Sequence, residues 1–436
     1  MSKNVNVDVK YLTRVEGHGN ILVNVENGNI EKCEWQVIEA PRFFESMVVG
    51  RNWKELHHIT SRICGICSIG HTTASVKATE DALGIEISEQ DKLLRKIALH
   101  GENTQSHILH VGYLALPDLF GAPSVIPLTS SHPKEVKTVI RIHRLANEMS
   151  TLLTGRTTHP QRIIPGGFSK IPTEEELKQL RERLENSKED LEAIADLLKK
   201  LAPNFPDFSR ETEFISLKSN KAYPLYEGEL FSSDTGIADL DDYENTVNEY
   251  IVEQSTAKYA KNNRESYMVG ALARLNNNFD QLTPEAKELA NEFNLVPICH
   301  NPYMNNIAQF VEIVHSFEDS IQIIDKLLDA GLQEQGEYHQ PEVDVKAGRG
   351  ISAVEVPRGI LFHDYTYDQD GVCTEANCVI PTNQNHGNIQ KDMEKLVPEM
   401  LDKPEEEIEL ALKMLVRAYD PCISCSTHYL NIKWVK

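Results

Sequence analysis

The fold of this chain is decided by two short stretches near its opposite ends, Arg62-Ile-Cys64-Gly-Ile-Cys67 and Asp420-Pro-Cys422-Ile-Ser-Cys425. In each stretch two residues separate a pair of cysteines, a spacing that lets both sulfur atoms turn toward one ion. On spacing alone, four thiolates indicate a structural zinc first and a redox cluster second. The separation of 358 positions (422 minus 64) counts against a small zinc ribbon. If the four sulfurs share one site, the whole protein is built around it.

The composition excludes several classes of function. The 436 residues are 40% hydrophobic and 25% charged, which is typical of a globular protein with a large core. A net charge of −22 argues against nucleic acid and anionic membranes as partners, because both bind basic patches. We find no secretory signal at the start and no apolar run near the roughly 20 residues of a membrane helix, so we expect a cytoplasmic location.

Hydrophobic periodicity predicts an α+β fold, mainly helical, with a long central helix bundle and small N-terminal and C-terminal β regions. Asn27-Gly28 between two alternating runs predicts a hairpin, and Thr173 with Glu176 predicts a capping box that opens a solvated acidic arm at 173–202. We expect a single domain, 1–436, divided at 71 and 348, whose two ends meet at the metal site. Strands are predicted over 20–25, 30–38, 351–356, 360–366 and 372–380, and helices over 72–83, 91–116, 134–154, 173–201, 245–278, 284–293, 306–332 and 391–419.

The residues around the cysteines carry a family resemblance. The first pair lies in an R-x-C-G-x-C-x-x-x-H pattern that ends at His71, and the second in a D-P-C-x-x-C-x-x-H pattern that ends at His428. Both patterns resemble the signature motifs of [NiFe]-hydrogenase large subunits. Further matches in the same order are Arg14-Val-Glu-Gly-His18, Pro41-Arg-Phe-Phe-Glu45, the run from Ser106-His107 to Asp118, and Glu355-Val-Pro-Arg-Gly359.

The resemblance implies two metal sites. Cys64 and Cys422 would be terminal thiolates on nickel, and Cys67 and Cys425 would bridge nickel to an iron that also carries one carbon monoxide and two cyanides. All four sulfurs must be deprotonated to bind. A separate Mg²⁺ site, which holds Fe²⁺ in some family members, would take Glu45, His428 and the backbone carbonyl of Cys378, with waters completing the octahedron.

The resemblance also implies roles for residues that do not bind metal. Glu16 would be the carboxylate that relays the proton released by H₂ cleavage. Arg358 would stand over the open metal face, where a permanent cation can polarise H₂ but accepts protons poorly. Asp118 and Asp420 would position Arg358.

Three more residues complete the implied surroundings of the metals. Pro381 and Thr382 would line the cyanides, with Thr382 donating a hydrogen bond. His71 would hydrogen-bond a bridging sulfur.

Arg42-Phe-Phe-Glu45 resembles the cytosolic, nicotinamide-linked branch, which includes sulfhydrogenase-type and electron-bifurcating enzymes. Besides the active-site pairs, the sequence has no cysteine set for an iron–sulfur cluster and no glycine-rich dinucleotide fingerprint. Electrons would therefore leave through a small subunit with iron–sulfur clusters, and then through flavin-bearing, diaphorase-type subunits. Alternatives are a heterodisulfide-reductase-linked or deazaflavin-reducing hydrogenase, a metal-free complex I-like subunit, and a zinc-stabilised scaffold.

Eight residues, 429–436, follow His428. Most members of the family that this chain resembles lose such an extension to a dedicated protease once nickel is in place. We expect cleavage after His428 to accompany nickel loading, and an intact mass of 436 residues in active enzyme would contradict this expectation.

Overall fold

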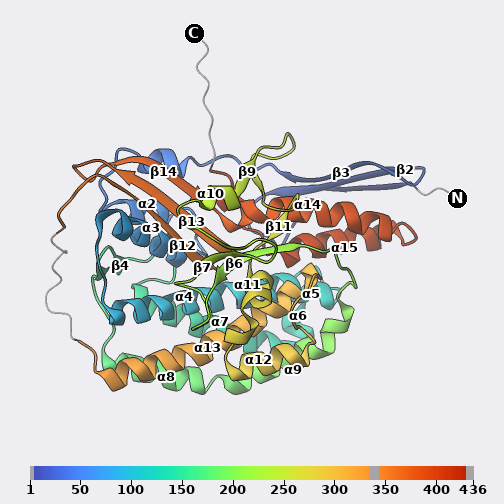
Figure 1. Cartoon of the computed structure of the whole chain (residues 1–436). Coiled ribbons are helices and arrows are strands. Elements are labelled where there is room, and N and C mark those ends of the chain that lie inside the picture. The colour runs from blue at the N-terminus through green and yellow to red at the C-terminus, as the bar shows by residue number, and fades with distance from the viewer. Residues whose placement is uncertain (1–3, 334–342, 429–436) are drawn as a thin grey trace, which may run out of the picture.

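The computed structural model describes residues 4–333 and 343–428 and has the α+β architecture that the sequence predicts (Figure 1). Long helices gather in one half of the molecule, and three-stranded sheets from the two ends of the chain lie over them. The expected cleavage after His428 concerns residues outside the described ranges. Within those ranges, no helix is long and apolar enough to cross a membrane.

The N-terminal sheet is antiparallel and ordered β1-β2-β3, with strands Val5–Val9, Gly19–Glu26 and Asn29–Val37. Alternate residues of β1 and β2 are buried, because successive side chains of a strand point to opposite faces. Asn27 and Gly28 both have positive φ, 52° and 82°, as the predicted hairpin turn requires. The hairpin prediction is confirmed.

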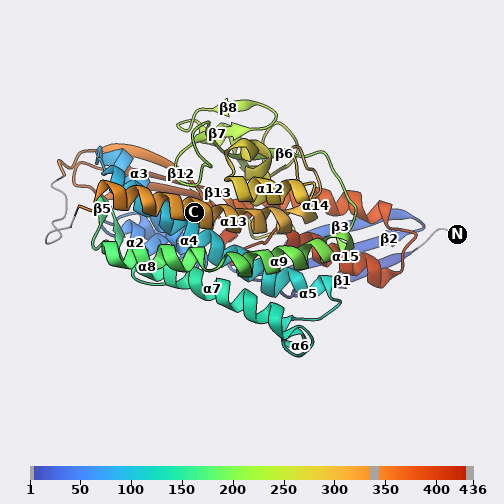
Figure 2. The same ribbon diagram turned by 90° about the horizontal axis from the view of Figure 1, so that it is seen from below.

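The helical layer is centred on α4 (Glu89–Leu109) and α13 (Asn305–Ala330), which pack along each other. α4 continues through a π-helical turn (His110–Ala115) into α5 (Leu116–Leu119), in place of the single helix predicted over 91–116. Figure 2 shows α7 and α8 along the outer face of this layer. The other helices here are α6 (Val125–Ser131), α7 (Pro133–Thr154), α8 (Glu174–Glu185), α9 (Lys188–Leu201) and α12 (Pro284–Glu292).

The acidic arm is not a solvated extension, and this part of the prediction is wrong. It consists of two helices, α8 and α9, that meet at Ser187, and the capping box of Thr173 and Glu176 opens the first of them as predicted. One apolar stripe is buried against α7 and α13, while the charges face outward. The buried side chains of this stripe are Leu177, Leu180, Leu184, Leu191, Ile194 and Leu198.

The helix predicted over 245–278 is also wrong for most of its length. Only α10 (Tyr243–Thr246) and α11 (Ala271–Asn278) are helical there, and short strands fill the stretch between them. Tyr267 and Met268 pair in parallel with Glu213 and Phe214, so tertiary strand pairing overrides helical propensity. The short strands of the molecule are β4 (Ile163–Ile164), β5 (Gly167–Phe168), β6 (Glu213–Lys218), β7 (Glu229–Ser232), β8 (Gly236–Ala238), β9 (Asn248–Tyr250), β10 (Tyr259–Lys261) and β11 (Tyr267–Met268).

The C-terminal sheet packs directly on the helix that follows the first cysteine pair. Its antiparallel strands are β12 (Gly348–Val356), β13 (Gly359–Tyr367) and β14 (Cys373–Val379), and α3 (Ser68–Leu83) lies across β12. A Cβ at Gly350 would lie 2.1 Å from the Ala78 carbonyl oxygen, so only glycine allows this approach. Two short helices, α1 (Phe44–Val48) and α2 (Leu56–Thr60), precede α3.

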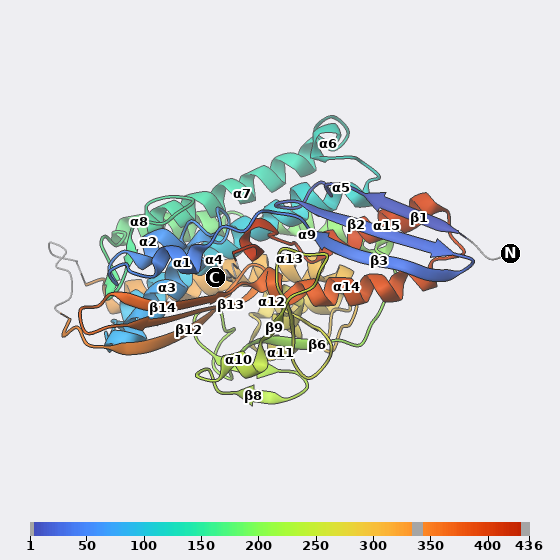
Figure 3. The same ribbon diagram turned by 90° about the horizontal axis from the view of Figure 1, so that it is seen from above.

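Two C-terminal helices close the molecule. α14 (Pro381–Glu399) packs on β3 and α15 (Glu405–Ala418) packs on β1, so the last part of the chain lies against the first (Figure 3). Short 3-10 turns occur at Ala202–Asn204, Phe279–Gln281, Pro302–Met304 and Ser424–Ser426. After α15 the chain turns at Asp420, which has a φ of 50°, and enters the second cysteine pair.

Candidate metal centre

The two cysteine pairs meet in the interior, as the sequence predicts. Cys64 Sγ lies 3.6 Å from Cys422 Sγ, and the sulfurs of Cys64, Cys422 and Cys425 all lie within 4.8 Å of one another. The fourth cysteine, Cys67, follows Cys64 in a turn in which its backbone N–H donates to Cys64 Sγ at 3.1 Å. All four side chains are buried. This set of soft sulfur donors fits a thiolate-bound transition metal.

The sulfurs of Cys422 and Cys425 lie directly against each other in this structure. Metal binding requires thiolates, so the metal-bearing form of the site is the one in which this pair is reduced. In the first pair, a hydrogen bond with Cys67 lowers the pKa of the Cys64 thiol to about 7, with Arg358 adding to the effect. The same hydrogen bond and burial raise the pKa of Cys67.

Arg358 lies over the sulfurs. Its Nη1 donates to Cys67 Sγ at 3.3 Å, while Nη2 donates to Asp420 Oδ1 at 2.8 Å and Nε to the Asp420 carbonyl at 2.5 Å. Burial opposes the charge, but Asp420 and the two thiols of Cys67 and Cys64 raise the pKa of Arg358, so it remains a guanidinium. Asp420, one of the two carboxylates expected to position Arg358, therefore contacts it through both its side chain and its backbone.

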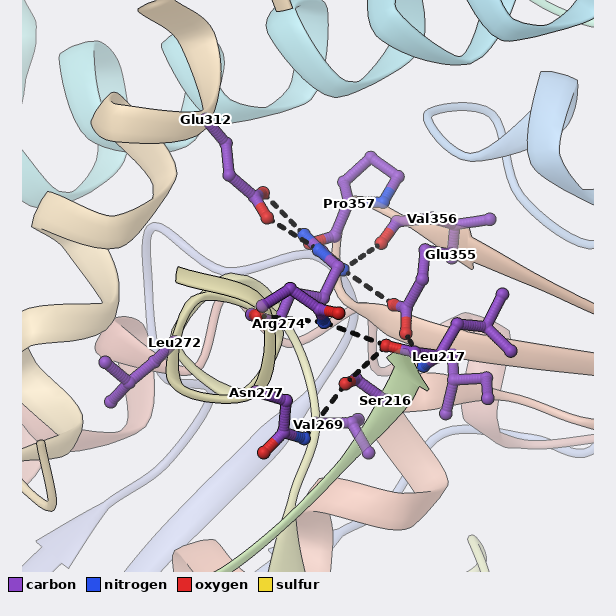
Figure 4. Close-up of polar contacts among 12 residues, drawn as sticks. Ser216, Leu217, Val269, Leu272, Arg274, Asn277, Glu312, Glu355, Val356 and Pro357 are labelled. Carbon is purple, nitrogen blue, oxygen red and sulfur yellow. Dashed lines mark hydrogen bonds and ion pairs between the residues drawn. The ribbon is translucent and has the colours of Figure 1, made fainter. Parts of the chain in front are cut away.

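A second buried arginine, Arg274, holds the turn that presents Arg358 (Figure 4). Its Nη1 donates to the Val356 carbonyl at 2.8 Å, and its Nη2 donates to the Pro357 carbonyl at 3.1 Å. The same guanidinium binds Glu355 Oε2 at 2.9 Å and both oxygens of Glu312 at 2.6 Å. Because Arg274 and Glu312 come from α11 and α13, the backbone that leads into Arg358 is held by the helical layer.

The two carboxylates around Arg274 differ in their acidity. Burial raises the pKa of Glu355 to about 7, although Arg274 opposes the shift. Burial also disfavours ionised Glu312, but Arg274 and His107 hold its pKa far below the usual range. The network therefore contains one permanent anion and one carboxyl group that is poised near neutral pH.

Asp118, the other carboxylate expected to position Arg358, has its side-chain partners elsewhere. Asp118 pairs with Arg417 through both oxygens, at 2.8 and 2.9 Å, and it also pairs with Arg14. Asp118 lies in α5, past the π-helical turn, and this turn directs it toward the end of α15 rather than toward the sulfurs. It therefore fixes the helix end from which Asp420 follows.

Glu16 lies beside the second cysteine pair. Its Oε2 accepts from the Ser424 backbone N–H at 3.0 Å, its Oε1 accepts from the Ser424 hydroxyl, and its carbonyl accepts from Ile423 N–H at 3.0 Å. On the opposite side, Thr382 Oγ1 accepts from Cys422 N–H at 3.1 Å. Pro381 and Thr382 begin α14 and line the small cavity at the sulfurs, as the prediction requires.

His71 lines the same cavity, but its recorded side-chain partner is His363, whose Nε2 lies 3.1 Å from His71 Nδ1. Burial and the neighbouring His363 lower the pKa of His71, so the imidazole is neutral. The sequence pointed to a bridging sulfur as its partner and gave no sign of His363, which comes from β13.

The residues expected at the second metal site also come together. Glu45 Oε1 lies in direct contact with His428 Nδ1, and Nε2 of the buried His428 ring has no hydrogen-bond partner among the described residues. Cys378 is buried close enough for Glu45 to raise the pKa of its thiol further, after the effect of burial. A carboxylate oxygen and an imidazole nitrogen without a hydrogen bond fit a divalent cation that waters complete.

Sequence reasoning missed two residues that hold the cysteine segments. Arg42 Nη2 donates to the Ile63 and Ser424 carbonyls, both at 2.6 Å, and so ties the first cysteine segment to the second. Glu102 is fully buried and accepts from the backbone N–H groups of Ile69 and Gly70, at 2.6 and 3.0 Å. It thereby satisfies donors in the first turn of α3, directly after Cys67. For Glu102, the one signal in the sequence was an acidic residue within the predicted helix over 91–116.

Comparisons with known proteins agree with this geometry. The family model for nickel-dependent hydrogenases matches residues 42–127 and 220–428, and a HoxL-like model matches residues 6–40. Sulfhydrogenase 2 subunit alpha of Pyrococcus furiosus is 32% identical over 435 residues, covering 98% of this chain and 100% of that one. The NAD-reducing hydrogenase HoxS subunit beta of Cupriavidus necator is 29% identical, covering 99% and 96%.

A solved structure shares the fold over nearly the full length. It is an NAD⁺-reducing [NiFe]-hydrogenase in the H₂-reduced state, with a TM-score of 0.86 at 26% identity, covering 97% of this chain and 99% of that one. With its helical layer, its two terminal sheets and its convergent cysteine pairs, the chain belongs to the nickel-dependent hydrogenases. Within that family it is the catalytic subunit of a [NiFe]-hydrogenase of the sulfhydrogenase and NAD-reducing type.

Proposed function

We propose that this chain carries the nickel–iron centre at which H₂ is reversibly split into protons and electrons. The observation that carries the proposal is the meeting of Cys64, Cys422 and Cys425 beneath Arg358 in a buried site. Cys64 and Cys422 would each bind the nickel but not the iron. Cys67 and Cys425 would bridge the nickel to the iron, which would also carry one carbon monoxide and two cyanides. When bound, this centre would supply the redox and Lewis-acid chemistry that divides H₂ heterolytically.

The chain's own residues would orient and polarise the substrate. Arg358 keeps its charge and is held from two directions by Asp420, so its guanidinium meets the site in a fixed orientation. Thr382 and Pro381, which line the small cavity at the start of α14, would line the cyanides. Burial of the whole set excludes bulk water, which strengthens each of these electrostatic contacts.

Glu16 would carry the proton away. The Glu16 carboxylate accepts two hydrogen bonds from Ser424, which lies between Cys422 and Cys425 in the sequence. The side chain of Glu16 is partly exposed. A proton that arrives at a cysteine sulfur would pass to Glu16 Oε1 or Oε2 and then outward. The amide of a glutamine keeps the shape of Glu16 but cannot take up the proton.

We therefore expect Glu16→Gln to retain nickel and iron while slowing H/D exchange by about 100-fold or more, the usual contribution of a positioned acid–base group. Isotope exchange followed by mass spectrometry would measure the effect. Glu26→Gln, on an exposed carboxylate at the end of β2, should exchange at the wild-type rate. Undiminished exchange in Glu16→Gln would remove this residue from the proton route.

We propose that the second site binds Mg²⁺ or Fe²⁺. Glu45 and His428 would supply an oxygen and a nitrogen, and the carbonyl of Cys378 a further oxygen, with waters as the remaining ligands. A cation at this site would hold His428 in place. Because His428 follows Cys425 by three residues, the cation would also hold the second cysteine pair.

Electrons would leave through partner subunits in the cytoplasm. No further group of cysteines gathers within the described residues, so the iron–sulfur clusters would belong to a small subunit. One relative is named as NAD-reducing, which favours flavin-bearing subunits that reduce NAD(P) as the next carriers. Other relatives are named F420-non-reducing hydrogenases, so a heterodisulfide-reductase-linked assembly is the second candidate. Electron bifurcation would need the same flavin partners.

Metal analysis together with infrared spectroscopy of the purified complex tests the proposal. We expect one nickel per chain and infrared bands from bound carbon monoxide and cyanide. Zinc alone at the four cysteines would favour a scaffold, and a chain without metal would favour a complex I-like subunit. Either of these results would overturn the proposed function.

A further inference from the structure

We propose that His100, His315 and Asp319 form a binding site for a divalent cation of the zinc class, separate from the thiolate centre. One ring nitrogen of each histidine and one carboxylate oxygen of Asp319 all lie within 4.8 Å of one another. His315 and Asp319 are four positions apart on α13, so they share one face of that helix, and His100 comes from the facing helix α4. Facing helices of a bundle are a common place for such sites.

Within the cluster, two of the ligand atoms bond each other and one ring nitrogen has no partner. His100 Nδ1 is bonded to Ser316 Oγ at 3.1 Å, which leaves His100 Nε2 to face Asp319 Oδ2 at 2.7 Å. His315 Nδ1 is engaged by the Thr283 backbone N–H at 3.2 Å and by its hydroxyl at 3.3 Å. His315 Nε2 is buried without a hydrogen-bond partner, and the side chain is 2% exposed. An unsatisfied buried imidazole nitrogen is costly unless something binds it.

The outer contacts match those of a metal-binding histidine. Such residues hold their second ring nitrogen through a hydroxyl, carbonyl or carboxylate, and this contact fixes the ring. Without a cation, Thr283 N–H donates to His315 Nδ1, so the single imidazole proton sits on Nε2. Binding at Nε2 requires the proton on Nδ1 instead, where Thr283 Oγ1 accepts it at 3.3 Å and the Thr283 N–H gives up its hydrogen bond to this nitrogen.

The site also has an entry path and an open coordination position. His100 and Asp319 line a cavity of about 680 Å³ that opens to solvent between α4, α13 and the β6–β7 loop. Two imidazoles and one carboxylate are a donor set that suits Zn²⁺, and three protein ligands leave a fourth position for water from the cavity. The cysteine centre lies elsewhere, among sulfurs that none of these three residues contacts.

A cation here would clamp the two central helices together. Further along the same helices, His107 of α4 donates to Glu312 of α13 at 2.7 Å, and Glu312 binds Arg274. The proposed cation would therefore add a second cross-link between α4 and α13, close to their contact with the network that holds the Arg358 turn. A ligand bound only by the folded chain stabilises it, and the gain grows with the logarithm of the ligand concentration relative to the dissociation constant.

Zinc titration of the purified holoenzyme complex tests this proposal. After treatment with a mild chelator, the wild-type complex should bind one zinc per chain with its nickel content unchanged, and its thermal unfolding midpoint should rise. His315→Gln and the nearly isosteric Asp319→Asn should abolish this binding. Ser316→Ala removes only the support of His100 and should weaken zinc affinity about 10-fold. His143→Gln, on the separate helix α7, is the matched control and should bind zinc like wild type.

Two results would overturn the proposal. One is a wild-type complex that takes up no zinc, and the other is equal zinc uptake by wild type, Asp319→Asn and His315→Gln. Nickel content and the infrared bands are measured on the same samples, so failure of the zinc site is distinguishable from failure of the proposed hydrogenase function. Circular dichroism of each variant identifies any that does not fold, and Asp319→Asn, at the cavity edge, keeps the shape of the site.

Discussion

Cys425 stands at the point where the second cysteine pair, α14 and the second metal site come together. Its sulfur lies within 4.8 Å of the sulfurs of Cys64 and Cys422, and all three side chains are buried. Replacement by alanine removes one of the four soft donors and leaves no nearby group to take its place.

We expect Cys425→Ala to lose most of its nickel and all detectable H₂ oxidation, because the proposed bimetallic centre would lack one of its two bridging sulfurs. Metal analysis by mass spectrometry is the measurement. Cys299→Ala provides the control, since that half-buried thiol lies outside both cysteine pairs. Recovery of normal nickel and iron in Cys425→Ala would refute the ligand assignment.

At this scale the sequence predicted the residues that lie in motifs and missed those that act through distant partners. The cysteines, Arg358 and Asp420 occur in local patterns, so each could be named before the structure was seen. Arg274 and Glu312 lie in no such motif, because their ion pair forms only when α11 and α13 pack together beside β12. The partners of Asp118 are likewise set by packing, and sequence spacing does not reveal them.

Among the elements, the turn from β12 to β13 depends most on a single side chain outside it. Arg274 balances two buried carboxylates and binds two carbonyls of the turn. Its removal would leave Glu312 and Glu355 without their cation in a dry environment, and breaking such a buried pair costs about 3–5 kcal/mol.

We therefore expect Arg274→Gln to lower the free energy of unfolding by about 3–5 kcal/mol and to reduce H₂ oxidation, since the Arg358 turn loses its anchor. Arg264→Gln is the matched control. Arg264 also pairs with two carboxylates, Asp234 and Glu211, but at the surface, where such pairs contribute only about 0–1 kcal/mol. Denaturant unfolding of both variants measures the difference, and equal losses would contradict the anchoring role.

Elements with strong local signals were predicted well from the sequence. The Asn27-Gly28 hairpin and the capping box at Thr173 both follow from local backbone chemistry, and the helix predicted over 72–83 ends at Leu83 as expected. The stretch 245–278 was misassigned because its short strands are stabilised by β6 and α14, which lie far away in sequence. Strands this short, paired with distant segments, show too little hydrophobic periodicity to be predicted from the sequence.

For the whole molecule, the decisive feature is the closure of the N-terminal sheet onto the C-terminal segment. Trp35 of β3 donates from Nε1 to His386 Nδ1 at 3.0 Å, and His386 Nε2 is bonded to Ser426 Oγ at 2.9 Å. Gln390 adds an acceptor for the Trp35 backbone N–H at 2.8 Å. The single neutral imidazole of His386 thus connects the first sheet to the residue after Cys425.

The state of His386 makes this closure sensitive to acid. Burial lowers the pKa of His386 to about 3, whereas the unfolded chain titrates near the ordinary value of 6.5. Below pH 6.5 the unfolded state therefore binds a proton that the folded state refuses. Stability that is present above pH 6.5 is lost as the pH falls toward 3, by about 1.4 kcal/mol per pH unit from this residue.

His386→Gln removes the titrating group, so its unfolding free energy should lack this one-proton slope. We expect the advantage of wild type over His386→Gln to be largest at pH 7 and to shrink steadily down to pH 5. Urea unfolding followed by tryptophan fluorescence is a suitable measurement, because Trp35 contacts His386 directly. Gln390→Leu breaks a neighbouring contact to the same strand without a titrating group, so its deficit relative to wild type should stay constant across this range. Parallel pH curves for wild type and His386→Gln would mean that closure of the two ends does not depend on a neutral imidazole at this position.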